Sequence, residues 1–323
     1  MVRPLRVAPG ASGAGQGKRR MGLNYHILDV FTERAFGGNP LAVVLEADHL
    51  TVPEMQAIAR EFNLSETVFV LKATSPGHTA RIRIFTPSRE IPFAGHPTLG
   101  TAALLADLRM PVVNGESDAI IALEEEIGSV RVGIRLRAGA AAYGEFDAPK
   151  IPDEPTEMTL PEEVAAALGL MQTEVGFENH KPMAVRGSVA FAFVPVANLD
   201  AMAKIKISSG HWARTFTDRG VDGAYVYTRQ CVRAHASFHA RMFAPDMGIP
   251  EDPATGSAAI GFARIMHAFD ALPDGTHKRT IEQGLEIGRP SAIQLVVTVD
   301  RGKFAGVRIG GHVVRVMEGV IRG

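Results

Sequence analysis

Short runs of alternating hydrophobic and polar residues follow one another along most of the chain, which predicts a protein rich in strands. Residues 25–31 are mainly β-branched and aromatic, and a Gly-Gly-Asn-Pro turn separates them from a second apolar run at 41–45. This opening predicts two strands joined by a hairpin or bend. Pro53 can start a helix, apolar residues then recur at helical spacing, and Asn63 is expected to end it.

The remaining pattern divides the chain near its midpoint. Period-two alternation predicts further strands at residues 66–71, 80–85, 119–123, 129–137 and 140–146. A polar stretch with three prolines then occupies residues 148–155. Such a stretch is typical of a linker, so we expect one domain at residues 21–147 and a second at residues 148–311. We also expect a C-terminal strand, at about residues 312–323, to return to the first domain.

The two halves carry related sequences. Residues 83–92 and 241–250 are identical at five of ten positions. After a two-residue gap in the second copy, residues 96–103 align with 252–259 and share a proline, a glycine and two alanines. The chain therefore contains two copies of one unit, a strand followed by a loop and a helix.

Each copy predicts a helix that is apolar on nearly all sides. The expected helices cover residues 97–108 and 253–267, and a helix without a polar face must be buried. Because strands are abundant in both halves, we expect them to surround these helices. The predicted fold class is α+β, with two pseudo-symmetric domains that each wrap a β-barrel-like sheet around a central helix.

The expected helix N-termini point to chemistry on anions. A helix N-terminus carries unpaired N–H groups and about half a positive charge, which attracts carboxylates. If both N-termini face one cleft, a small carboxylate is the natural ligand, and His96 and Asp252 could carry protons beside it. Each residue also has a simpler interpretation: Asp252 as a helix N-cap, His96 as a packed histidine, and Glu66 as a solvated charge at a strand end.

Composition narrows the function classes. The chain has 323 residues, with 34 Lys and Arg against 35 Asp and Glu, and this balance argues against a nucleic-acid partner. The longest apolar stretch, at residues 188–199, is interrupted by Pro195 and is too short to span a membrane. Residues 1–20 are basic, lack the apolar core of a secretory signal, and are interpreted as an extension outside the fold. We therefore expect a cytoplasmic protein.

Five motifs in a fixed order resemble one known family. They are FGGNPLAVV at 36–44, NLSETVF at 63–69, FAGHPTLG at 93–100, DPATGSA at 252–258 and GLEIGRPS at 284–291. Together they resemble the PhzF-like phenazine-biosynthesis isomerase family, from about residue 25 to the C-terminus. The resemblance implies the diaminopimelate epimerase fold, with the active site between two pseudo-symmetric domains.

The resemblance also implies roles for individual residues. Glu66 would be the acid/base that moves a proton between two carbons of a small, possibly cyclic, carboxylate, and His96 and Asp252 would assist it. The residues expected to hold the substrate are Ser65, Gly95, Gly256 and Ser257. The family member with known chemistry works without metal or organic cofactor and as a homodimer, so the resemblance implies the same for this chain. A shielded glutamate with a raised pKa can act first as base and then as acid.

Other activities fit the sequence less well. The epimerase and proline racemase branches of this fold use paired cysteines, whereas this chain has only Cys231, which we interpret as a buried apolar residue. On the strand expected at 230–242, His235 and His239 would share a face with two arginines, which disfavours a metal. Ser257 lacks the pattern of a nucleophile elbow. A carboxylate-binding protein of the same fold without turnover stays the alternative to an isomerase.

Overall fold

The computed structural model describes residues 22–158, 160–187 and 189–322, so the expected extension at residues 1–20 lies outside the described residues. In the first half, strands and helices follow in the order β1 (Leu23–Val30), β2 (Asn39–Val44), α1 (Val52–Phe62), β3 (Glu66–Leu71), β4 (Ala80–Phe85), β5 (Glu90–Ile91), α2 (Gly95–Arg109), β6 (Glu116–Glu125), β7 (Gly128–Arg137) and β8 (Ala142–Asp147). All strands predicted for this half are confirmed, with ends shifted by a few residues.

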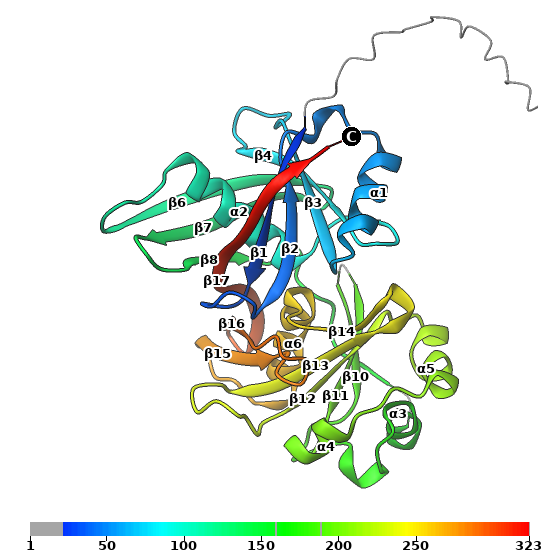
Figure 1. The fold of residues 1–323 in the computed structure, drawn as a ribbon. Coiled ribbons are helices and arrows are strands. Elements are labelled where there is room, and N and C mark those ends of the chain that lie inside the picture. Colours follow the sequence, from blue (N-terminus) through cyan, green and yellow to red (C-terminus); the bar gives the residue numbers. More distant parts are fainter. Residues whose placement is uncertain (1–21, 159, 188, 323) are drawn as a thin grey trace, which may run out of the picture.

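The second half repeats this order with two extra helices and one extra short strand. Its elements are β9 (Thr156–Glu157), α3 (Pro161–Leu168), β10 (Met183–Arg186), β11 (Ala190–Pro195), α4 (Leu199–Lys204), α5 (Ser209–Thr215), β12 (Gly223–Thr228), β13 (Phe238–Ala244), β14 (Ile249–Asp252), α6 (Gly256–Phe269), β15 (Gly275–Gln283), β16 (Ser291–Asp300) and β17 (Lys303–Ile321). Figure 1 shows the first half above the second.

Strand pairing confirms the duplication read from the sequence. In the first half β2 and β3 are parallel, β3, β4 and β5 are antiparallel neighbours, and β6 returns parallel to β4. The second half repeats these relations. Strands β11 and β12 are parallel, β12, β13 and β14 are antiparallel neighbours, and β15 returns parallel to β13. The predicted antiparallel pair at the start of the chain is also confirmed, as β1 and β2.

The two central helices are buried as predicted. In α2 every residue from Gly95 to Ala106 is buried, and α6 buries nine of its 14 residues. Phe262 of α6 packs its ring against the rings of three residues on β12 and β13, Tyr225, Tyr227 and Phe238, at centroid distances of 4.7–5.9 Å. Burying a large aromatic side chain typically contributes several kcal/mol, about 3–5 for Phe→Ala. Hydrophobic packing against the sheets therefore holds both helices in place.

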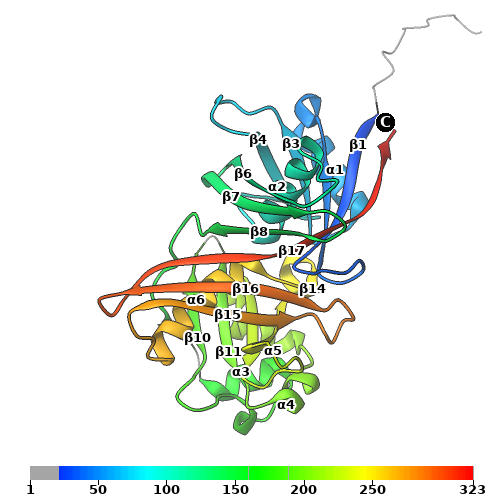
Figure 2. The same ribbon diagram turned by 90° about the vertical axis from the view of Figure 1, so that its left-hand side faces the viewer.

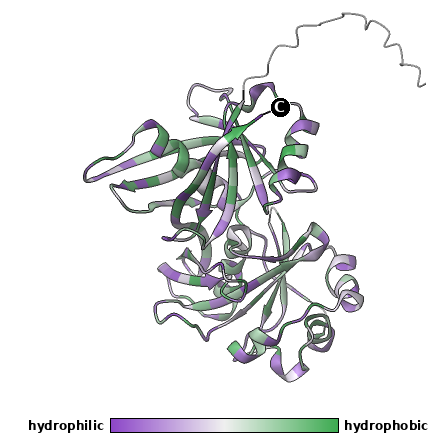
Figure 3. Cartoon of the chain, in the orientation of Figure 1, coloured by the Kyte–Doolittle hydropathy of each residue, from purple (hydrophilic) through white to green (hydrophobic). Residues whose placement is uncertain are grey.

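Helices at the periphery are amphipathic instead. Helix α1 begins with a capping box in which Thr51 and Glu54 exchange hydrogen bonds, and it ends at Asn63, whose φ of 51° is left-handed. This confirms the predicted start near Pro53 and the end at Asn63. Figure 3 shows bands of hydrophilic and hydrophobic residues on the outer helices, as expected for helices with one covered side.

Strand β17 joins the two halves. Its first part pairs with β16, its middle with β8, and its last nine residues, Val313 to Ile321, run antiparallel to β1. Figure 2 shows β17 lying beside β16 and then continuing to β1. A single strand thus belongs to the sheets of both halves. The predicted boundary near residue 148 stays a prediction.

Two predictions about the second half were wrong. The segment predicted as one strand from residue 230 to 242 is a loop as far as residue 237, and β13 begins only at Phe238. Arg233 and His235 therefore do not share a strand face with His239. Cys231 lies in this loop and is only partly buried, so its interpretation as a buried apolar residue is also corrected. Within the described part of the chain, no helix has both the length and the apolar character needed to cross a membrane.

Candidate active site

Glu66 is the first residue of β3 and points at the start of α2. Its side chain is buried, and its Oε2 lies 3.4 Å from Nε2 of His96 in the first turn of α2. Within the described residues, neither of these two atoms has a hydrogen-bond partner. Buried polar atoms are rarely left without partners except at functional sites. The pair is therefore a candidate reaction centre.

Burial sets the protonation of this pair. Removal from water raises the pKa of Glu66 well above its ordinary value, and the nearby charge of Asp252 raises it further. Burial lowers the pKa of His96 to about 3, so its imidazole is neutral at physiological pH. A carboxyl group with a raised pKa next to a neutral imidazole can exchange a proton near neutral pH.

Asp252 ends β14 and connects the two halves. Its Oδ1 accepts hydrogen bonds from Nδ2 of Asn39 at 2.9 Å and from Oγ of Ser65 at 3.2 Å, both in the first half. Its Oδ2 accepts a hydrogen bond from Oγ1 of Thr255 at 2.6 Å. Burial raises the pKa of Asp252 to about 6, although these three hydrogen bonds oppose the rise. Asp252 thus places Ser65, the neighbour of Glu66, against the start of α6.

Three residues of this network were missed by sequence reasoning. Gln283, the last residue of β15, donates hydrogen bonds from Nε2 to the Asp252 carbonyl at 2.8 Å and to Oγ1 of Thr255 at 3.0 Å. Asn39 and Thr255 lay inside two of the quoted motifs, so they could have been found. Gln283 precedes the last motif by one residue, and only the parallel pairing of β15 with β13 brings it to the site.

Gly95 and Gly256 bring the two helix N-termini into contact. A methyl group on Gly95 would lie 2.9 Å from Cα of Gly256, and one on Gly256 would lie 3.1 Å from Cα of Gly95. Neither N-cap residue, Ala94 or Thr255, caps its helix with a side-chain hydrogen bond. Two positive helix ends repel each other when they meet, and an anion bound beside both of them relieves that repulsion. The contact is therefore suited to a carboxylate.

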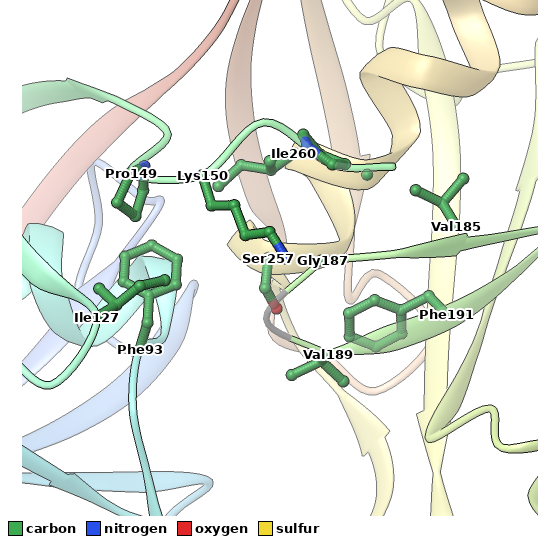
Figure 4. Close-up of a pocket in the computed structure, with 12 residues that line it drawn as sticks. Phe93, Ile127, Pro149, Lys150, Val185, Gly187, Val189, Phe191, Ser257 and Ile260 are labelled. Carbon is green, nitrogen blue, oxygen red and sulfur yellow. The ribbon is translucent and has the colours of Figure 1, made fainter. Parts of the chain in front are cut away.

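Ser257, the second residue of α6, lines a narrow pocket between the halves, beside the Gly95–Gly256 contact (Figure 4). The structure thus brings all seven predicted site residues to the meeting point of the two halves. Their individual roles stay predictions.

The simpler interpretations of Asp252 and Glu66 do not fit the structure, whereas His96 is buried, as a packed histidine would be. Helix α6 begins at Gly256 after the N-cap Thr255, so Asp252 is not its N-cap. His96 lies inside the first turn of α2, two residues after the N-cap Ala94, so the predicted start at Pro97 was late by two residues. Glu66 is 9 % exposed, so it is not a solvated strand-end charge.

His239 is the centre of a separate ion-pair cluster. Its two ring nitrogens lie 2.8 Å from carboxylate oxygens of Glu282 and Glu286. Burial opposes its charge, but the two carboxylates outweigh burial and raise the pKa of His239 to about 9. His239 is therefore a cation at neutral pH. Among the described residues no group of three or more His, Cys, Asp or Glu side chains is placed to hold a metal ion.

Comparison with known proteins identifies the family. The family model described as phenazine biosynthesis-like protein matches residues 28–319. The chain belongs to this family. A Mesorhizobium japonicum protein named as an uncharacterized isomerase is 49% identical over 301 residues, which cover 92% of this chain and 97% of that protein. The trans-2,3-dihydro-3-hydroxyanthranilate isomerase of Pseudomonas aeruginosa is 34% identical over 297 residues, 91% of this chain and 98% of that enzyme.

Solved structures agree with the family and the fold. The Bacillus anthracis phenazine biosynthesis protein of the PhzF family matches with a TM-score of 0.82 and 25% identity over 93% of this chain and 99% of that one. A hydroxyproline epimerase from Agrobacterium vitis has a TM-score of 0.61 at 14% identity over 94% of each chain, a likeness of fold alone. The predicted α+β, epimerase-like fold is confirmed, and the chain is an isomerase of the phenazine biosynthesis-like family.

Proposed function

We propose that this protein is a cofactor-independent isomerase that moves a proton between two carbons of a small carboxylate, with Glu66 as the acid/base. The observation that carries the proposal is the buried pair of Glu66 and His96, whose facing atoms lie 3.4 Å apart and have no hydrogen-bond partner among the described residues. It lies where Asp252 and the N-termini of α2 and α6 meet.

In the proposed reaction, the two helix N-termini bind the substrate carboxylate beside the contact between Gly95 and Gly256. The Glu66 carboxylate takes a proton from one carbon, and the electron pair of the broken C–H bond moves into the adjacent π system. Protonated Glu66 then returns the proton to a different carbon, and the double bond shifts. The same proton leaves one carbon and returns to another, so the reaction needs no oxidant or reductant. Neutral His96 donates or accepts a hydrogen bond beside Glu66, and Asp252 holds Ser65 in place.

The relative from Pseudomonas aeruginosa supports this substrate class, since the compound in its name, a dihydro-hydroxyanthranilate, is a cyclic carboxylate. We extend to this chain only the class of small carboxylate, not that compound. The resemblance also implies a homodimer. Sedimentation of the purified protein would test that expectation.

The test is hydrogen exchange in D₂O. The wild-type protein is incubated with trans-2,3-dihydro-3-hydroxyanthranilate and with a panel of small cyclic carboxylates. NMR should show that a compound used as substrate incorporates deuterium at carbon. Glu66→Gln should lower the rate by about 10²–10⁴, the usual contribution of a general base. Glu116→Gln, at an exposed position on β6, is the control. Exchange in the Glu66 variant at the wild-type rate would contradict the proposal, and ligand binding without exchange by the wild type would favour a carboxylate-binding protein.

A further inference from the structure

His239 of β13 bridges two carboxylates that lie on either side of a site residue in the sequence. Its Nδ1 lies 2.8 Å from Oε1 of Glu282 on β15. Its Nε2 lies 2.8 Å from Oε1 of Glu286, in the segment at residues 284–290 that we call the clasp loop. Gln283, a residue of the site network, stands between the two glutamates. His239 is 1% exposed, so one buried imidazole holds the chain on both sides of Gln283.

The clasp loop is attached at both ends to the segment that carries Asp252. Before the loop, Gln283 donates from Nε2 to the Asp252 carbonyl at 2.8 Å. After the loop, Oγ of Ser291 donates to the Pro253 carbonyl at 3.0 Å. The backbone around Asp252 therefore depends on the position of this loop.

A third contact links the clasp loop to the first half. Arg289 donates from Nε to the Gly38 carbonyl at 3.0 Å and pairs through Nη2 with Asp29. Gly38 directly precedes Asn39, whose Nδ2 donates to Oδ1 of Asp252 at 2.9 Å. The loop thus supports the Asp252 carboxylate as well as its backbone.

The matching place in the first half lacks this bridge. By strand register, Arg81 of β4 and Glu124 of β6 match His239 and Glu282. Both glutamates accept hydrogen bonds from two successive backbone N–H groups of a preceding loop. Arg81, however, is exposed and has no ion-pair partner among the described residues, and a two-residue turn at 126–127 stands where the second half has the clasp loop. The glutamate therefore belongs to the repeated scaffold, whereas the bridge is a feature of the second half and its site residues.

We propose that His239 is a positioning residue for the reaction. As a cation between Glu282 and Glu286, it holds the clasp loop in place and so keeps Asp252 beside Glu66. Without that cation the two carboxylates repel each other in a partly buried place, and the loop is released. This inference rests on the proposed function, which gives Glu66 the proton transfer.

The groups around the bridge determine the pH at which it opens. Burial lowers the pKa of His239, but Glu282 and Glu286 outweigh burial and raise it to about 9. The other charged or titratable groups that act on these carboxylates, directly or through an ion pair, are Arg241 on β13, Glu251 on β14 and Cys231 in the loop before β13. The bridge is therefore complete at neutral pH and opens as the pH rises through about 9.

Two variants of the full-length protein test the positioning role in the deuterium-exchange assay. His239→Gln removes the cation, and Glu286→Gln removes the carboxylate of the clasp loop. Each should lower kcat by about 10- to 10²-fold with little change in KM, because a small displacement of a site group slows the chemical step. Each should also move the acidic limb of kcat/KM to lower pH, because the Asp252 charge, which adds to the effect of burial on the pKa of Glu66, moves away.

A double variant and a matched control sharpen the result. His239→Gln combined with Glu286→Gln should be no slower than the worse single variant, because both changes break one bridge. Wild-type kcat should fall above about pH 9, and His239→Gln should lack that fall. Glu124→Gln, at the first-half counterpart of Glu282, should leave kcat and the acidic limb unchanged.

Amide hydrogen exchange measures the clasp loop without any substrate. The Thr255 N–H donates to Oε1 of Gln283 at 3.2 Å. In His239→Gln and Glu286→Gln this amide should exchange about tenfold faster than in the wild type at pH 7, and in Glu124→Gln it should not. If His239→Gln does not fold, Glu286→Gln gives the answer, because its side chain is 22% exposed and tolerates the change more easily.

The outcomes separate this proposal from the proposed reaction. Wild-type protection of the Thr255 amide in folded Glu286→Gln would overturn the positioning role. Faster amide exchange with an unmoved kcat and acidic limb would also overturn it, because the bridge would then serve the fold alone. If Glu66→Gln keeps the wild-type rate while His239→Gln slows it, Glu66 is not the base and the role of His239 stands. If the wild type turns over none of the compounds, the proposed reaction fails and the Thr255 amide decides whether His239 holds the loop.

Discussion

The two halves of the molecule use one strand plan but different side chains at matched positions. Arg83 on β4 pairs with Glu90 on β5, and Arg241 on β13 pairs with Glu251 on β14 in the same two-pronged way. Each guanidinium also lies over a phenylalanine two residues further along its strand. This ion pair is a structural part of the repeated unit.

The site residues do not repeat. Strand register places Glu66 of β3 opposite Leu41 and places Gly223 of β12 opposite Phe191, so Gly223 holds the position that Glu66 has in the first half. By the same comparison Glu125 of β6 matches Gln283 of β15. The scaffold is duplicated, but only the first half carries the candidate base. In this chain, the residues that repeat between the halves determine the fold, and the residues that do not repeat form the candidate site.

Asp252 in the second half should control the pKa of Glu66 in the first. Asp252→Asn removes a negative charge that raises the pKa of Glu66. We expect kcat/KM to fall by about 10²-fold and the acidic limb of its pH profile, where Glu66 loses its proton, to move to lower pH. Rates measured from pH 4 to 9 check this shift. Asp222→Asn, at the residue before β12, is the control. If the acidic limb of the Asp252 variant stays at the wild-type pH, Asp252 does not control the pKa of Glu66.

Glu125 can ionise, whereas Gln283, at the matching position of the second half, cannot. Oγ1 of Thr98 lies 2.9 Å from the Ala94 carbonyl and 2.8 Å from Oε1 of Glu125. A hydroxyl has one hydrogen to give, so a protonated Glu125 that donates to Thr98 satisfies both contacts. Burial raises the pKa of Glu125 to about 8.

Glu125→Gln should therefore change how stability depends on pH. The folded protein keeps the Glu125 proton up to about pH 8, whereas the unfolded chain loses it near its ordinary pKa of about 4.3. The stabilising contribution is complete below that lower value and disappears as pH rises toward 8, a loss of a few kcal/mol. The variant should lack this loss. Urea unfolding at pH 5.5 and 8.5 measures it, with Glu116→Gln as control; equal pH dependence in wild type and Glu125→Gln would contradict it.

The contact between the two helix N-termini can be broken directly. Gly95→Ala places a methyl group 2.9 Å from the backbone of Gly256, which must push the halves apart and should lower the free energy of unfolding by about 1–3 kcal/mol. Exchange activity should fall with it. Gly210→Ala in α5, where a methyl group meets nothing within 4 Å, should be neutral or slightly stabilising. Thermal unfolding compares the two, and similar melting temperatures would mean that the contact is loose.

The repeated ion pairs should differ in strength. The Arg241 side chain is 10% exposed and that of Arg83 is 22% exposed, and Arg241 also donates to the buried Met202 carbonyl at 2.8 Å. Removing a buried charge leaves its partner unpaired. Arg241→Met should therefore destabilise the protein by about 1–2 kcal/mol more than Arg83→Met. Equal losses in denaturant unfolding would show that burial does not distinguish the two halves.

The duplication was predictable because both copies keep the same apolar spacing and the same Arg, Phe and Pro positions. Those residues decide strand pairing and helix burial, and the structure follows them. The loop at 231–237 was predicted as strand because its residues alternate, but Glu282 accepts hydrogen bonds from the N–H groups of Val232 and Arg233. A side chain distant in sequence thus replaces the ladder that a strand would need.

The site was predictable only in part for a similar reason. Glu66, His96 and Asp252 lie in motifs that can be recognised in the sequence. Gln283 has no local signal, because it reaches Asp252 only through strand pairing in the second half.

Strand β17 makes the folding of the first half depend on chain that follows the second half. Because β17 pairs first with β16 of the second half and then with β1 of the first, the first half completes its sheet with chain that follows the second. The first half therefore cannot be cut out as a working module, and a ribosome must release the whole polypeptide before the first-formed half is closed. A protein made in this way should melt in one step and should tolerate no stop codon short of its last strand.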